Sequence, residues 1–100
     1  MSNSERFTDE NELGRIEACA SYEWAEFHAW KYDGRIWYAE DSGCSCNWWD
    51  TGYVDVTPVN SVHELFSYAS QFVESAKGYG VNIDDYTRFV TQVQKRMTEI

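Results

Sequence analysis

Apolar and polar residues alternate in the first half of this chain and recur at helical spacing in the second half. The stretch 22–41 is rich in aromatic residues around Asp33-Gly34, a dipeptide favoured in two-residue hairpin turns because both positions need positive φ. A turn flanked by Tyr32 and Arg35 fixes the register of the two strands. It predicts three cross-strand pairs: Trp30 with Trp37, His28 with Ala39, and Glu26 with Asp41.

The predicted ribbon has two apolar faces, because neighbouring residues of a strand point to opposite sides. One face carries the larger aromatic residues: Tyr22, Trp24, His28, Trp30, Tyr32 and Trp37. The other carries residues among which the alanines would let a helix approach closely: Ala25, Phe27, Ala29, Ile36 and Tyr38. A lone hairpin is marginally stable, so we expect one face to be covered, and the second to be covered or adhesive.

Helical spacing begins after residue 60. A capping-box pair, Ser61 and Glu64, opens a first amphipathic helix whose apolar stripe ends before Gly78. Asn82 caps a second helix. Its apolar stripe comprises Ile83, Tyr86, Phe89, Val90, Val93 and Met97. The short connection predicts antiparallel packing of the two helices.

The pattern indicates a small two-layer domain of the α+β class. Its expected order is an antiparallel β-hairpin plus a short third strand at 53–56, followed by an antiparallel helical hairpin. Pro58 excludes a central strand position and is expected to end the β portion of the chain. We expect residues 1–12 to form a mobile acidic N-terminal arm, with a helical turn over 10–16, and residues 13–100 to form the single domain.

The formal charge of −9 is concentrated in residues 1–50, which hold eleven acidic residues against four basic ones. Such a negative field repels phosphate backbones, which disfavours direct nucleic-acid binding and favours a basic protein partner. An alternative is an acidic DNA mimic that occupies a basic groove. The chain has neither a long apolar run nor a signal-like N-terminus, so we expect a cytoplasmic protein without membrane contact.

Three cysteines without a secretory signal predict reduced thiols. The residues available for a zinc site are Cys19, Cys44, Cys46 and His63. However, the C-x-C spacing is shorter than that of typical zinc knuckles, so packing as small buried hydrophobic residues is favoured over metal binding. A redox pair of Cys44 and Cys46 is a further alternative. We therefore expect no cofactor, with zinc as the alternative.

No catalytic pattern stands out. His28 and His63 belong to no recognisable nucleophile motif, and the glycines fit no phosphate-binding loop. Glu26 and Asp41 face each other in the predicted register, but without a pocket they are weak evidence for acid–base chemistry. We therefore expect no catalytic residues and no enzymatic activity.

Tryptophan is the most informative residue type for function here, because it is enriched in interface hot spots. Trp48 and Trp49 are adjacent, so in an extended segment they point to opposite sides and one should reach the surface. The alternative is that both side chains fold back onto the core. The residues expected to bind a partner are Trp24, Trp30, Trp37, Trp48 and Trp49. The partner would be another protein or a second copy of the chain.

The residues around the turn and the cysteines resemble those of a known group. They resemble the W…DG-x-aromatic-A-x-DSGCSC core of uncharacterised small proteins encoded by tailed phages of actinobacteria, through Trp30, Asp33-Gly34-Arg35, 37–39 and 41–46. Those proteins continue with a Pro-rich stretch, where this chain has NWWD. The resemblance implies a phage accessory protein that binds and modulates a host factor in the bacterial cytoplasm.

Overall fold

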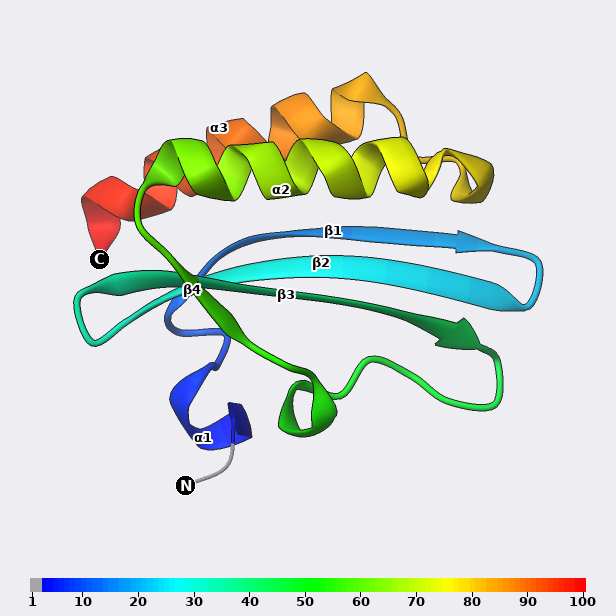
Figure 1. The fold of residues 1–100 in the computed structure, drawn as a ribbon, viewed down its shortest axis with the longest axis horizontal. Helices are drawn as coiled ribbons and strands as arrows, with labels where there is room; N and C mark the ends of the chain where they lie inside the picture. The colour runs from blue at the N-terminus through cyan, green and yellow to red at the C-terminus, as the bar shows by residue number, and fades with distance from the viewer. Residues whose placement is uncertain (1–2) are drawn as a thin grey trace.

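The computed structural model describes residues 3–100 and has two layers, a four-stranded antiparallel sheet and a pair of helices (Figure 1). The strands lie side by side in chain order: β1 (Glu12–Ala20), β2 (Glu23–Tyr32), β3 (Arg35–Cys44) and β4 (Thr57–Val59). Helices α2 (Val62–Ser75) and α3 (Ile83–Glu99) cover one face, and the short α1 (Asn3–Arg6) lies on the other. The α+β class is confirmed, with a larger sheet than the sequence predicted.

The central hairpin has the predicted turn and the predicted register. Asp33 and Gly34 both have positive φ, 54° and 73°, as a two-residue turn of this kind requires. All three predicted cross-strand pairs of β2 and β3 are present: Trp30 with Trp37, His28 with Ala39, and Glu26 with Asp41. The alanine-containing face lies under the helices, as expected.

Strand β1 corrects the prediction of a helical turn over residues 10–16, because it pairs with β2 along almost its whole length. A bulge between Glu12 and Gly14 shifts the register by one residue, so Leu13 and Ile16 both reach the helix-side core. Their spacing of three residues imitates a helix in the sequence. The alternation of apolar and polar residues that is typical of a strand is therefore interrupted in β1.

The described part of the expected arm packs on the sheet, while residues 1 and 2 lie outside the described residues. Phe7 is buried, with its ring 5.2 Å from that of Trp30, 5.5 Å from Tyr32 and 5.4 Å from Trp37. The side-chain amide of Asn3 donates to the carbonyl of Val54. Residues 3–7 thus help to cover the face opposite the helices.

The third strand of the prediction is displaced. Tyr53 lies in the 3-10 turn η1 (Thr51–Tyr53) and is exposed, Val54 is buried, and the strand itself is β4. Pro58 pairs with Trp37 at the sheet edge, where the missing amide of a proline is tolerated.

The helix starts are as predicted, but the end of α2 is not. Ser61 accepts a hydrogen bond from the Glu64 amide, and Asn82 forms a reciprocal capping box with Asp85. After α2 the chain continues through the 3-10 turn η2 (Lys77–Tyr79), and the left-handed glycine is Gly80, not Gly78. α2 and α3 run in opposite directions in Figure 1.

Two separate cores lie on the two faces of the sheet. The helix-side core contains Leu13, Ile16, Ala25, Phe27, Ala29, Val59, Leu65, Ala69, Phe72, Val73, Ala76, Val81, Phe89 and Val93. Ile83 was expected in it but is exposed. The loop-side core is smaller and contains Phe7, Trp30, Ala39 and Val54, with Tyr32, Trp37, Trp49 and Val56 packed against it.

Candidate binding site

Side chains on the face opposite the helices form rows across β1, β2 and β3, because directly paired residues share a face. From one end of the sheet to the other, the rows are Glu12–Trp30–Trp37, Arg15–His28–Ala39, Glu17–Glu26–Asp41 and Cys19–Trp24–Gly43. The third row places three carboxylates next to one another. Like charges directly opposite are destabilising, so a cation near this row would be stabilising.

His28 is the centre of a buried polar cluster. It is 2% exposed; its Nδ1 lies 3.2 Å from Glu12 Oε2, and its Nε2 lies 2.7 Å from Glu26 Oε1. The Trp49 ring stacks on the imidazole with a centroid distance of 3.8 Å. The Arg15 guanidinium donates from Nε to Glu12 at 2.7 Å. The cluster therefore joins β1, β2 and the loop that follows β3.

The carboxylates determine the protonation of this cluster. Burial alone would lower the pKa of His28, but the hydrogen bonds to Glu12 and Glu26 outweigh it and raise that pKa above its ordinary value. Burial alone would raise the pKa of Glu12, but the hydrogen bonds from His28 and Arg15 outweigh it and lower that pKa. Both shifts favour an imidazolium held between two carboxylates.

Residues 43–47 form a tight corner that fixes the Trp24 ring. The Trp24 indole donates to the carbonyls of Cys44 (3.1 Å) and Asn47 (2.9 Å). A Cβ at Gly43 would lie 2.9 Å from the Trp24 ring and 2.6 Å from Asn47 Oδ1, so the close approach requires glycine. The corner thereby sets the direction in which the chain continues into Trp48.

A hollow of about 270 Å³ opens on this face beside the corner. Its lining residues are Glu17, Ala18, Cys19, Trp24, Glu26, Trp48 and Trp49. Trp24 is buried, Trp49 is half-buried against His28, and Trp48 is 75% exposed. We call this hollow the tryptophan pocket; it combines aromatic walls with two carboxylates.

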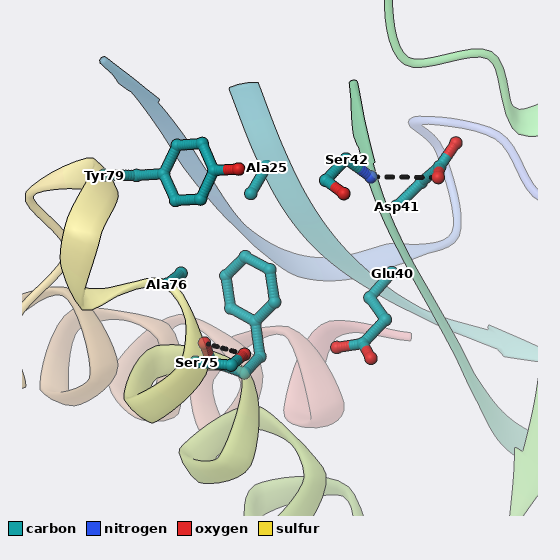
Figure 2. A pocket seen from close by; sticks show the side chains of 8 residues that line it. Ala25, Glu40, Asp41, Ser42, Ser75, Ala76 and Tyr79 are labelled. Carbon is teal, nitrogen blue, oxygen red and sulfur yellow. Dashed lines mark hydrogen bonds between the residues drawn. The ribbon is translucent and has the colours of Figure 1, made fainter. Parts of the chain in front are cut away.

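A larger hollow of about 400 Å³ lies on the helix side, between β3 and the end of α2 (Figure 2). Figure 2 shows Glu40 reaching in from β3 and Tyr79 from the segment after α2. Partial burial raises the pKa of Glu40. The polar groups of Ser42 and Ser75 bond locally, the Ser42 amide to Asp41 and the Ser75 hydroxyl to the Phe72 carbonyl. The tryptophan pocket is the better candidate, because its aromatic walls can bury a ligand.

The cysteines do not form the expected arrangement. Cys44 and Cys46 are joined in a disulfide, which corrects the prediction of reduced thiols. All three cysteines are exposed, so they are not small buried hydrophobic residues. His63 is in the first turn of α2, whereas Cys44 is the last residue of β3. Figure 1 shows that α2 begins and β3 ends at opposite ends of the sheet. Among residues 3–100, no group of three or more His, Cys, Asp or Glu side chains could hold a metal ion.

The structure brings together three of the five tryptophans named as partner-binding residues. Trp24, Trp48 and Trp49 line the tryptophan pocket, whereas Trp30 is buried and Trp37 is half-buried in the loop-side core. The residues that sequence analysis missed are Glu12, Arg15 and Glu17. All three residues lie on β1, a strand that could not be predicted because the bulge between Glu12 and Gly14 interrupts its alternating pattern.

No protein-family model, curated protein or solved structure matches the chain. Along residues 3–100, no helix is both long enough and apolar enough to cross a membrane. The tryptophan pocket and the His28 cluster are therefore the features from which a function can be proposed.

Proposed function

We propose that this protein acts by binding a protein partner through the tryptophan pocket. The observation that carries the proposal is the exposure of Trp48 on a corner fixed by the two hydrogen bonds of the Trp24 indole. A large aromatic side chain held toward solvent is an interface anchor, and a fixed loop reduces the ordering cost of binding. In this role the protein needs no catalytic residue.

The partner in this proposal is a basic host protein. The charge of −9 attracts a positively charged surface and repels nucleic acid. The resemblance of the W…DG…DSGCSC residues to small phage proteins supports an accessory protein that acts in the host bacterial cytoplasm and modulates a host factor. Self-association through the same face is the alternative within this class.

The test is quantitative affinity capture from a bacterial extract with the wild-type protein, Trp48→Ala and Tyr53→Ala. Tyr53 is the matched control, since it is an exposed aromatic residue of the same loop and does not line the pocket. We expect a protein that the wild type and Tyr53→Ala retain and that Trp48→Ala loses; it is then purified and its affinity measured. Retention that is the same for all three proteins would show that the pocket is not the interface.

The disulfide between exposed Cys44 and Cys46 favours a second candidate function, a redox module. A partner dithiol would attack one sulfur and be oxidised to a disulfide, leaving Cys44 and Cys46 as two thiols. Thiol content at equilibrium with defined glutathione ratios tests this function. Half-reduction at roughly −120 to −270 mV, the range of catalytic thiol–disulfide proteins, would favour it.

The third possibility, an acidic DNA mimic, differs in salt dependence. A mimic would hold its partner mainly through surface carboxylates, and its affinity would fall steeply with salt. Binding through tryptophans should change much less. Measuring the affinity of the captured partner at low and high salt separates the two interfaces.

A further inference from the structure

The carboxylates that contact Arg15 and His28, two of which line the tryptophan pocket, outnumber these two cations. Arg15 and His28 contact four carboxylates, those of Asp9, Glu12, Glu17 and Glu26. The contact of Arg15 with Glu17 is the longest of its three ion pairs, at 3.6 Å, compared with 2.7 Å to Glu12 and 3.0 Å to Asp9. The charge of Glu17, directly opposite Glu26 on the next strand, is therefore the least compensated.

Both the tryptophans and the two glutamates that line the pocket favour a bound cation. The face of a tryptophan ring attracts a cation more strongly than other aromatic rings do. Trp24, Trp48 and Trp49 contribute to the wall, while Glu17 and Glu26 are part of the same lining. An aromatic wall beside two adjacent carboxylates matches a flat cation that can stack and donate several hydrogen bonds at once.

We propose that the tryptophan pocket receives an arginine side chain of a basic protein partner. This inference rests on the proposed function and specifies the chemistry of the partner. The guanidinium stacks on the exposed tryptophan, its N–H groups donate to the Glu17 and Glu26 carboxylates, and its methylenes contact the indole rings. The volume of about 270 Å³ is below that of typical small-molecule sites, which suits one side chain.

The test is an NMR titration of the folded protein with n-butylguanidinium, which reproduces the arginine side chain without a backbone. We expect saturable shifts of the Trp48 and Trp49 indole N–H signals, with a Kd on the order of 1 mM, as so few atoms allow. n-Butanol, a neutral chain of the same length, should bind at least about tenfold more weakly, because it lacks the charge. n-Butylammonium should lie between the two, because it cannot stack as a plane.

Two pairs of variants assign the binding to the pocket. Glu17→Gln should weaken n-butylguanidinium binding by about two- to fivefold, whereas Glu74→Gln on the exposed face of α2 should not change it. Both variants change the net charge equally, so a general field effect would affect them alike. Trp48→Ala should weaken binding by at least about threefold, and Tyr53→Ala should leave it unchanged.

Several results would overturn the arginine assignment. These are the absence of saturable shifts, equal binding of n-butanol, tighter binding of n-butylammonium, or equal effects of Glu17→Gln and Glu74→Gln. Failure of the proposed function itself is distinguishable, because it appears as partner capture that does not depend on Trp48. Capture that needs Trp48 without selective n-butylguanidinium binding would reject only the arginine assignment.

Discussion

The two faces of the sheet are built by different means. The helix-side face is closed by α2 and α3, and its core cluster consists of apolar residues. The opposite face is closed by residues 3–7 and by the loop that follows β3, and it encloses His28, the single buried polar residue among residues 3–100. His28 is satisfied by carboxylates of the strands themselves, Glu12 on β1 and Glu26 on β2, and the loop covers it with the stacked Trp49 ring.

This difference separates stability from recognition. The helix-side core has 14 buried apolar residues and the loop-side core has four, so the helix side supplies most of the hydrophobic driving force for folding. The loop side leaves Trp48 exposed and Glu17 poorly compensated, arrangements that lower stability but favour a ligand. Substitutions on the two faces should therefore have different consequences.

The largest effect is expected from Phe27→Ala on the helix side. Phe27 is fully buried, and its ring lies 5.4 to 5.6 Å from those of Tyr38, Phe72 and Phe89. The cavity should lower the free energy of unfolding by about 3–5 kcal/mol, measured by urea denaturation. Trp48→Ala removes a larger side chain from the opposite face but should cost less than about 0.5 kcal/mol. Equal losses for both variants would remove the distinction between the faces.

A smaller effect is expected from Gly43→Ala in the corner that holds Trp24. The added methyl would displace the ring or Asn47, at a cost of about 1–3 kcal/mol, and should change the Trp24 fluorescence. Gly78→Ala is the matched control, because a Cβ there meets nothing within 4 Å and its φ is ordinary. If Gly43→Ala were as stable as the control, close packing of Trp24 on Gly43 would not hold the corner.

The corner also contains the disulfide, which encloses only one residue. Replacing both Cys44 and Cys46 with serine should lower the free energy of unfolding by about 1–2 kcal/mol, because closing so short a loop removes little entropy from the unfolded chain. Urea denaturation of the double variant and of the reduced wild type should agree, and Cys19→Ser should match the oxidised wild type. Loss of folding in the double variant would mean that the corner supports the helix side as well.

Local signals in the sequence were sufficient for the hairpin and both helix starts. Asp33-Gly34 fixed the register, and Ser61 and Asn82 marked the caps, because turn and cap geometry depends on a few neighbouring residues. β1 was not predicted, since its bulge gives Leu13 and Ile16 a helical spacing. Bulges depend on tertiary packing, which a local pattern does not contain.

The candidate site was predicted only in part for the same reason. Trp48 and Trp49 were identified by residue type, and Glu26 by its place in the hairpin register. Glu12 and Glu17 come from β1, so their approach to His28 and Glu26 depends on a long-range strand pairing. The disulfide was considered only as an alternative to reduced thiols, because the expectation for Cys44 and Cys46 came from compartment and spacing, which do not fix the position of two sulfurs.

The smallest effect is expected from the pH dependence of the His28 cluster, because a neutral imidazole still stacks on Trp49 and still donates one hydrogen bond. The raised pKa of His28 means that its stabilising contribution is complete below the ordinary value of 6.5 and is lost as pH rises through the folded-state pKa. The lowered pKa of Glu12 has its effect at acidic pH: the stabilising contribution of this carboxylate is complete above pH 4.5 and is lost as pH falls through its folded-state pKa. The free energy of unfolding should therefore fall as pH rises above about 6.5 in the wild type and in His63→Gln, whose histidine is exposed. In His28→Gln this fall should be absent, and a fall of the same size in that variant would place the titrating group elsewhere.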